Sequence, residues 1–184
     1  MTSINRKIKL KSLQVHGLYL YDESFSSWII QYKECCDEIL GPYFLTPFLY
    51  ELKLKYKNCV LIPAPSSKEK MEERGFHAVI EIFKSLSLEI EDCFIKTKEV
   101  KQSKRSKWER QKIEEAIQLV KVPKRKKVIL IDDVCTTGNT LLTMHHLLKE
   151  KGIKSKALVL AIHPLLVSKC DSIRQVEKFI LTKK

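Results

Sequence analysis

The chain has 184 residues, which is enough for one domain with a substantial core and too few for two domains of ordinary size. Charged residues make up 30% of it and hydrophobic residues 44%, so the composition excludes a wholly disordered chain. The net charge of +12 favours polyanionic partners, either nucleic acid or phosphorylated metabolites, although a lysine-rich proteome produces the same bias without a functional reason.

The six cysteines are scattered and none forms a C-x-x-C pair, which argues against a structural zinc site and suits a reducing compartment. The N-terminus is basic but has no apolar core of signal-peptide length. Nowhere is there an apolar run long enough to span a bilayer. We therefore expect a cytoplasmic protein with no membrane insertion.

The N-terminal third is predicted to form a strand followed by helices. Residues 13–21 are dense in strand formers, and residues 25–32 carry apolar side chains at helical spacing. Two prolines in residues 38–56 interrupt any single helix there. We expect residues 1–56 to be an N-terminal strand and helical cap of the same domain as a core formed by residues 57–184.

A second strand is predicted at residues 58–63, N-C-V-L-I-P, and two prolines stiffen the chain where it leaves this strand. Downstream, Arg74 stands beside Gly75, and a guanidinium held there could fork onto a phosphate. The alternative is a surface arginine just before a helix break. A helical pattern follows over residues 79–86.

The segment from residue 96 to 112 is strongly basic and follows a short strand predicted at residues 92–95. A capping box at residues 106–109 predicts a helix that starts at Ser106 and carries apolar side chains as far as Val120. The part before this helix is expected to be a mobile loop. It is either a solvated charge run or a segment that closes over pyrophosphate or holds a nucleic-acid backbone.

Residues 127–142, K-V-I-L-I-D-D-V-C-T-T-G-N-T-L-L, are predicted to be a strand, a loop and the start of a helix that ends near Gly152. The first amides of a helix lack internal acceptors, so this loop can hold a phosphate. Asp132 and Asp133 are suited instead to accept hydrogen bonds from sugar hydroxyls, or to orient Mg²⁺ through its waters. A phosphate cradle beside paired hydroxyl acceptors indicates a phosphorylated ribose.

The rest of the chain completes an α/β pattern, with a buried strand at residues 155–162 and a last edge strand at residues 178–181. Strands that alternate with helices predict a parallel sheet with its ligands at the carboxyl ends of the strands. Taken singly, the features of residues 127–142 also fit a helix N-cap, a solvated acid and an ordinary turn. They match neither a Walker A loop nor a dinucleotide-binding fingerprint.

The sequence V-I-L-I-D-D-V-C-T-T-G-N-T-L resembles the motif with which type I phosphoribosyltransferases bind 5-phosphoribosyl 1-pyrophosphate (PRPP). The resemblance implies an α/β fold with a central, mostly parallel sheet flanked by helices and an N-terminal hood, and Mg²⁺ that binds with PRPP rather than directly to protein ligands. It implies catalytic roles at the ribose hydroxyls for Asp132 and Asp133. The residues around the ribose and its 5′-phosphate would be Asp132, Asp133, Val134, Cys135, Thr136, Thr137, Gly138, Asn139 and Thr140. Those that bind pyrophosphate would be Ala64, Pro65, Ser66, Ser67 and Arg74.

The order of three motifs resembles one branch of these proteins, the ComF family, which is linked with DNA uptake in naturally competent bacteria. The motifs are R-G-F-H-A after I-P-A-P, the stretch from Gln102 to Arg110, and D-D-V-C-T-T-G-N-T. With Y-D-E-S-F-S-S-W-I-I-Q-Y-K, the resemblance extends over residues 18–162. Family members commonly carry an N-terminal cysteine-pair zinc module that this sequence does not show, and His77 stands where asparagine is usual.

Two functions follow from the resemblance. The first is transfer of a phosphoribosyl group from PRPP to a nitrogen nucleophile, and the second is a non-catalytic protein that binds PRPP and single-stranded DNA, or a partner helicase, during DNA uptake. A receiver-like domain with a phosphorylated aspartate is a third reading that leaves T-T-G-N-T without a role. The resemblance leaves the acceptor and any oligomeric state open. The residues expected in a flap over the site or in contact with nucleic acid are Lys101, Gln102, Ser103, Lys104, Arg105 and Arg110.

Overall fold

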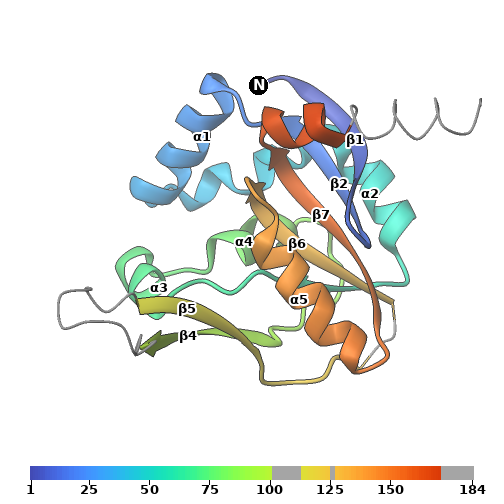
Figure 1. The fold of residues 1–184 in the computed structure, drawn as a ribbon. Helices are drawn as coiled ribbons and strands as arrows, with labels where there is room; N and C mark the ends of the chain where they lie inside the picture. The colour runs from blue at the N-terminus through green and yellow to red at the C-terminus, as the bar shows by residue number, and fades with distance from the viewer. Residues whose placement is uncertain (101–112, 125–126, 171–184) are drawn as a thin grey trace, which may run out of the picture.

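A computed structural model describes residues 1–100, 113–124 and 127–170. Its centre is a five-stranded sheet in the order β1-β2-β7-β6-β3 (Figure 1). The strands from β2 to β3 are parallel to one another, and only β1, at one edge, is antiparallel to its neighbour. The bounds are β1 Ser3–Leu10, β2 Leu13–Leu20, β3 Val60–Pro63, β6 Lys127–Cys135 and β7 Lys154–Ile162. The sheet is thus mostly parallel, as the sequence predicts.

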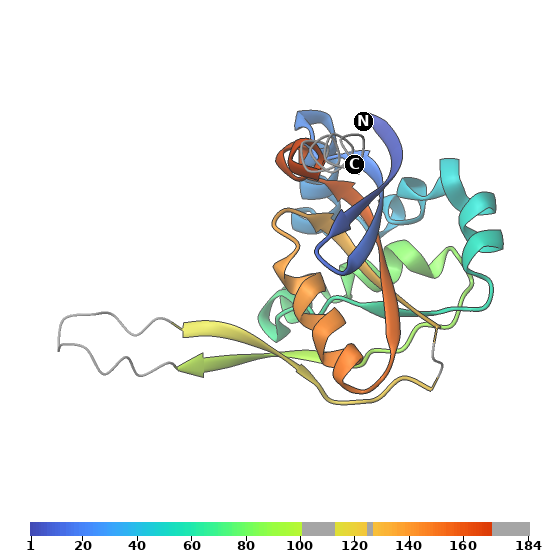
Figure 2. The same ribbon diagram turned by 45° about the vertical axis from the view of Figure 1, so that its right-hand side comes forward.

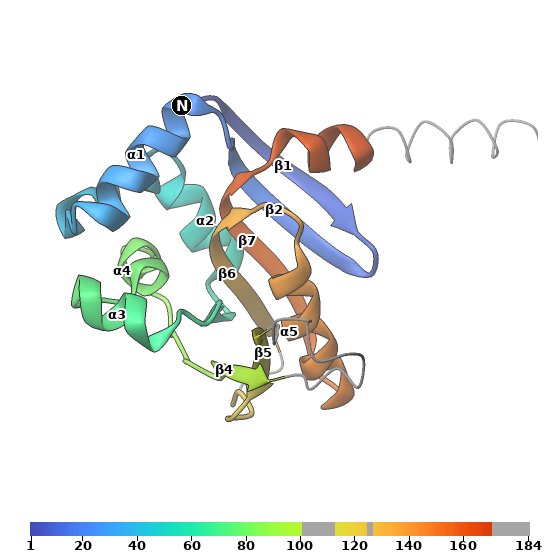
Figure 3. The ribbon, with the colours of Figure 1, turned by 60° about the vertical axis from the view of Figure 1, so that its left-hand side comes forward.

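Helices cover both faces of this sheet, and each face has its own apolar core (Figure 3). On one face lie α1 Glu23–Glu34, α2 Leu49–Tyr56 and α4 Ala78–Lys84, and on the other lie α5 Asn139–Glu150 and a helical stretch at residues 164–170. The remaining short helices are η1 Glu38–Leu40, η2 Pro42–Phe44, η3 Thr46–Phe48 and α3 Lys68–Arg74. The α/β class is confirmed, and the 3-10 turns η2 and η3 each contain one of the prolines that interrupt residues 38–56.

Strand β1 was not predicted from the sequence. Its residues alternate between exposed and buried only towards the end, where Ile8 and Leu10 enter the core, because β1 lies at the edge of the sheet. It pairs with β2, and β2 in turn pairs with β7. The N-terminal segment therefore contributes two strands to the same sheet as the predicted core.

The helix predicted from Ser106 to Val120 is wrong where the structure describes it. Residues Ile113–Leu119 form strand β5, which pairs along its length with β4, Phe94–Val100, in a two-stranded antiparallel sheet. Figure 2 shows this pair projecting away from the main sheet. Strand β4 also replaces the first part of the loop expected after residue 95. Cross-strand pairing, together with packing of Ile117 and Leu119 against the α5 side of the core, outweighs the local helical spacing.

Two predictions fall on residues outside the described ranges. They are the flap residues Lys101, Gln102, Ser103, Lys104, Arg105 and Arg110, and the edge strand at residues 178–181. Within the part of the chain that the structure describes, no helix is both long and apolar enough to cross a membrane.

Candidate functional site

The predicted pyrophosphate and ribose segments leave the sheet side by side. Strand β3 pairs with β6 so that Pro63 lies beside Ile131, and the amide of Ala64 continues the ladder by donating to the Ile131 carbonyl at 2.8 Å. The chain then passes through Pro65, Ser66 and Ser67 into α3, while Asp132 follows Ile131 on β6. Parallel pairing thus brings together two segments that are about seventy residues apart in sequence.

The segment expected to hold the 5′-phosphate forms a tight turn between β6 and α5. Gly138 has a φ of 77°, in the left-handed region that favours glycine, and α5 begins at the next residue. The side chains of Thr136 and Thr137 are exposed, and Thr140 lies in the first turn of α5. The amide of Asn139 donates to the Thr137 hydroxyl at 3.4 Å, and Gly138, at the N-cap, has no side chain to accept from the amides that follow, so those amides can serve a ligand.

Two residues of the motif serve the fold through their side chains. Cys135 is 2% exposed in the core under α5, and burial raises the pKa of its thiol to about 12. Val134 packs against the core on the opposite face of the sheet. Their side chains therefore position the loop, and only their backbone groups could meet a phosphate.

Asp132 and Asp133 lie at the end of β6 with unequal surroundings. One carboxylate oxygen of Asp132 accepts from the amide of Asp133 at 2.9 Å. Burial, followed by the neighbouring negative charge of Asp133, raises the pKa of Asp132 to about 8. Asp133 instead forms an ion pair with Lys33 of α1. Asp133 thus has a cationic partner, whereas burial disfavours the charged form of Asp132, although the two residues are adjacent.

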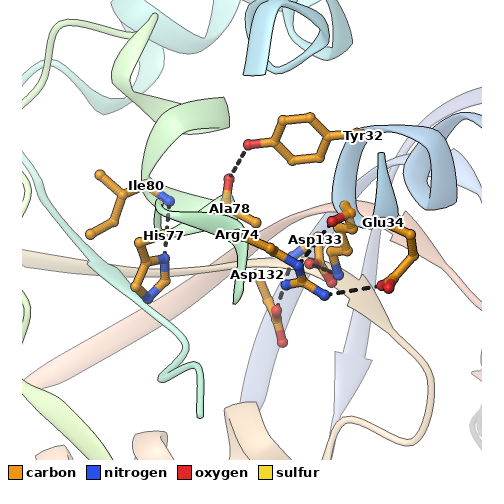
Figure 4. A network of polar contacts seen from close by, with 9 residues as sticks. Tyr32, Glu34, Arg74, His77, Ala78, Ile80, Asp132 and Asp133 are labelled. Atoms are coloured by element: carbon orange, nitrogen blue, oxygen red, sulfur yellow. Dashed lines mark hydrogen bonds and ion pairs between the residues drawn. The ribbon is translucent and has the colours of Figure 1, made fainter. Parts of the chain in front are cut away.

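Helix α1 lies over this pair through its last turn (Figure 4). The guanidinium of Arg74 donates through Nε to the Lys33 carbonyl at 3.0 Å and through its terminal nitrogen to the Glu34 carboxylate at 3.1 Å. Deeper in the core, the Tyr32 hydroxyl donates to the Ala78 carbonyl at 2.8 Å, which ties α1 to the start of α4. The end of α1 therefore contacts both a predicted ribose residue and a predicted pyrophosphate residue.

Lys33 was not singled out from the sequence. The helical pattern before it marks only the buried side chains, and Lys33 follows the last of them, Tyr32. A signal was nevertheless present, because Lys33 ends the segment Y-D-E-S-F-S-S-W-I-I-Q-Y-K through which the resemblance to the ComF family begins.

Arg74 is fixed by the backbone rather than left on a free surface. It is the last residue of α3, and Gly75 follows in the left-handed conformation with a φ of 79°, its amide donating to the Met71 carbonyl at 2.9 Å. This cap ends the helix so that the guanidinium, only 12% exposed, lies beside α1. Its role in binding pyrophosphate stays a prediction.

His77 occupies the N-cap of α4. Its Nδ1 accepts from the amide of Ile80 at 3.4 Å, which is the role that an asparagine side chain performs at such a position. Burial lowers the pKa of His77, so its imidazole is neutral and the departure from asparagine adds no charge here. With Nδ1 accepting, the proton is on Nε2, a buried atom without a hydrogen-bond partner among the described residues.

The described residues contain no group of three or more His, Cys, Asp or Glu side chains placed to hold a metal ion. Of the carboxylates described at this site, Asp132 is partly buried, Asp133 is paired with Lys33, and Glu34 is paired with Arg74. Such a donor set is smaller than Mg²⁺ requires from protein alone, and suits an ion that arrives with phosphate ligands of its own.

Comparison with known proteins agrees with this geometry. Residues 73–171, more than half of the chain, match the family described as the phosphoribosyl transferase domain. The chain is 31% identical over 141 residues to the competence protein ComFC of Streptococcus pneumoniae R6 and 33% identical over 143 residues to that of Bacillus subtilis 168. The chain belongs to the ComF family. It therefore has a type I phosphoribosyltransferase-like α/β fold.

The two ComFC matches cover 75% and 76% of this ComF-family chain, but the chain spans only 63% and 59% of those relatives. Similar solved structures include a hypoxanthine phosphoribosyltransferase from Staphylococcus aureus, with 16% identity, a TM-score of 0.42, and coverage of 69% of this chain and 65% of that one. An orotate phosphoribosyltransferase from Aeropyrum pernix has 17% identity and a TM-score of 0.36, and the match covers 92% of this chain and 83% of that one.

Proposed function

We propose that this ComF-family chain binds PRPP together with Mg²⁺ at the carboxyl ends of β3 and β6. The observation that carries the proposal is the position of two adjacent carboxylates, Asp132 and Asp133, near the carboxyl end of β6 and a few residues before the N-terminus of α5. Carboxylates repel a phosphate but accept from the 2′ and 3′ hydroxyls of ribose, and helix amides attract the 5′-phosphate. Few ligands other than a phosphorylated ribose combine these two groups at this spacing.

Each segment then has one task. Residues 136–140 hold the 5′-phosphate, Asp132 and Asp133 orient the ribose, and the segment from Ala64 to Ser67 with Arg74 receives the pyrophosphate. Bound Mg²⁺ neutralises part of the pyrophosphate charge. Because Arg74 and Asp133 are paired with Glu34 and Lys33 before the ligand arrives, binding exchanges these partners for ligand oxygens.

We also propose phosphoribosyl transfer as the activity of the site, supported by the family match. The bond between C1′ of the ribose and the pyrophosphate oxygen breaks, and pyrophosphate leaves with the electron pair. A nitrogen nucleophile then forms a bond to C1′ and gives up a proton. The contribution of Asp132, Asp133 and the α5 amides is to hold the ribose while positive charge develops at C1′. We propose DNA uptake as the process served, which the resemblance to the ComF family implies, and the relatives are named competence proteins.

Calorimetric titration with PRPP and Mg²⁺ tests the binding site. The parent chain is expected to bind, and the double variant Asp132→Asn, Asp133→Asn is expected to lose about tenfold or more in affinity, because an amide replaces each charged acceptor. A matched control is Asp37→Asn, Asp92→Asn, which removes the same charge outside the proposed site. Equal affinities for all three proteins would show that the assignment is wrong.

Release of pyrophosphate from PRPP, measured with a panel of nucleobases and amines, tests transfer separately. Release with at least one acceptor, and its loss in the Asp132→Asn, Asp133→Asn variant, is the expected result. Binding of PRPP with no release across the panel would instead favour the non-catalytic PRPP-binding protein. In that case single-stranded DNA binding with a steep salt dependence becomes the next measurement.

A further inference from the structure

A second cleft lies at the opposite end of the sheet from the proposed PRPP site. Its volume is about 1060 Å³, and it is lined by the first residues of β6 and β7, the last turns of α2 and α5, and part of the β1–β2 hairpin. In Figure 1, β7 begins beside the end of α5. Parallel strands start at one end of a sheet and finish at the other, so the cleft takes the first residues of β6, as far as Ile129, and Asp132 lies in the second half of the same strand.

The charge of this cleft is one-sided. The whole chain has 34 basic and 22 acidic residues, yet none of the residues that line the cleft is acidic. Lysines come to it from β1, α2, β6, α5 and β7 or from the residues next to these elements. The lining lysines are Lys7, Lys55, Lys57, Lys127, Lys149, Lys154 and Lys156. We call this region the lysine cleft.

Some of these lysines have an ordinary structural explanation. Lys55 and Lys149 lie in the last turns of α2 and α5, where a positive charge favours the helix dipole. The strand lysines have no such reason. Lys127 of β6 and Lys154 of β7 are register partners in the sheet, and like charges placed opposite each other on neighbouring strands destabilise the pairing. Lys156 follows two residues later on β7.

Groups in the wall of the cleft also experience this excess of positive charge. The Nζ of Lys55 lies 3.1 Å from Nδ1 of the buried His16, and that nitrogen also hydrogen bonds to the Tyr56 hydroxyl at 3.0 Å. Burial, followed by the charge of Lys55, lowers the pKa of His16 to about 4. Burial, followed by the charge of Lys7, lowers the pKa of Lys55 as well, and the ion pair of Lys55 with Glu51 at 3.6 Å offsets only part of this. An anion placed among these groups would relieve the repulsion.

The volume of the cleft and the residues that line it indicate which kind of anion could bind there. Its volume is that of a small-molecule site, and lysine ammonium groups bind phosphate as point charges. Proteins that hold single-stranded nucleic acid without sequence preference usually stack the bases on exposed aromatic rings. The aromatic side chain of this lining is Tyr56, which is only 6% exposed. The lining therefore suits the phosphates of a small ligand better than the bases of a strand.

We propose that the lysine cleft binds a small molecule that carries two or more phosphate groups, at a site separate from the PRPP site. The strand lysines Lys127, Lys154 and Lys156, which are all exposed, contact the phosphates. This inference does not depend on whether the other end of the sheet binds PRPP.

The test uses the variant Lys127→Gln, Lys154→Gln, Lys156→Gln and a control with the same charge change, Lys84→Gln, Lys124→Gln, Lys169→Gln, at exposed positions outside the cleft. Inorganic triphosphate and ATP, both without Mg²⁺, are titrated by calorimetry into each protein, and PRPP with Mg²⁺ is titrated in parallel. Any anion binding at the PRPP site is common to both variants, so the difference between them reports on the lysine cleft.

The expected result is that triphosphate or ATP binds the parent and the control alike, and about tenfold or more weakly to the cleft variant. Without ligand, the cleft variant should unfold at a temperature no lower than the parent, because like-charge repulsion is removed. PRPP affinity should be unchanged. Equal phosphate affinity in all three proteins overturns the proposal. So does a fluorescent oligothymidylate that loses binding in the cleft variant while both small phosphates do not, since the ligand would then be a strand.

Discussion

At Asp132 the fold disfavours an ionised carboxyl, whereas the proposed contact with ribose uses that carboxyl as an acceptor. Its carboxyl is partly buried at the end of β6, beside the carboxyl of Asp133, and burial raises its pKa to about 8. A raised pKa means that the folded chain holds this proton more tightly than the unfolded chain. Without a ligand, ionised Asp132 therefore destabilises the fold. Its presence is better explained by the ribose hydroxyls that it is proposed to accept from.

The pH dependence of this effect has a definite sign. The contribution of protonated Asp132 to stability is fully present below the unfolded pKa, near 3.8, and is lost as the pH rises towards about 8. We predict that Asp132→Asn stabilises the ligand-free protein by roughly 1–3 kcal/mol at pH 8 and by little at pH 4.5. Urea unfolding of both proteins across this pH range measures the difference. A difference that stays constant with pH contradicts the account.

At the scale of elements, the N-terminal hairpin supports the phosphate loop. A Cβ built on Gly138 would lie 2.5 Å from a methyl carbon of Leu10, at the end of β1. The loop thus depends on glycine for two reasons, its left-handed backbone and the close approach of β1. Strand β1, which was not predicted from the sequence, therefore contacts the loop between β6 and α5, which was predicted best.

Gly138→Ala is therefore predicted to destabilise the protein more than the same change at Gly152. Both glycines have positive φ, of 77° and 72°, so both variants lose about 1 kcal/mol from the backbone. Only Gly138 adds a clash, worth roughly 0.5–1.5 kcal/mol more because the methyl group of Leu10 must turn aside, whereas nothing lies within 4 Å of a Cβ at Gly152. Thermal unfolding of the two variants checks this order.

Leu10→Ala, combined with Gly138→Ala, separates the two causes. If the clash is real, the double variant is more stable than the sum of the single changes predicts, because the smaller side chain makes room for the new methyl group. Strictly additive losses would show that β1 does not press on the loop.

The same elements show what local sequence can predict. Residues 127–142 were interpretable because their strand, loop and helix signals are consecutive and need no distant partner. Strand β5 was mistaken for a helix because its identity depends on pairing with β4, and β1 was missed because an edge strand has little apolar alternation. Lys33 meets Asp133 only after α1 has packed across the sheet, so its role lay in tertiary contacts.

At the scale of the whole molecule, the positive charge is unevenly placed. One end of the parallel sheet has the acid pair with an open helix terminus, and the other has seven lysines around a cleft. The net charge of +12 alone is compatible with several kinds of polyanionic partner. From where the charges lie, we expect a phosphorylated sugar to bind at one end of the sheet and a small polyphosphorylated molecule at the other.

Thermal unfolding of the parent and Asp132→Asn at pH 7.5, each with and without saturating PRPP and Mg²⁺, tests the central claim most directly. Without ligand the variant should unfold at the higher temperature, because the fold no longer has to hold Asp132 protonated or to bury its charge. With ligand at about 100 times the dissociation constant of the parent, the parent gains about 2.7 kcal/mol and a variant that binds about tenfold more weakly gains about 1.4 kcal/mol. The unfolding temperature of the parent should therefore rise by several degrees, and that of the variant by about half as much or less. An equal rise in both proteins, or none in the parent, contradicts the claim that Asp132 binds the ribose of PRPP.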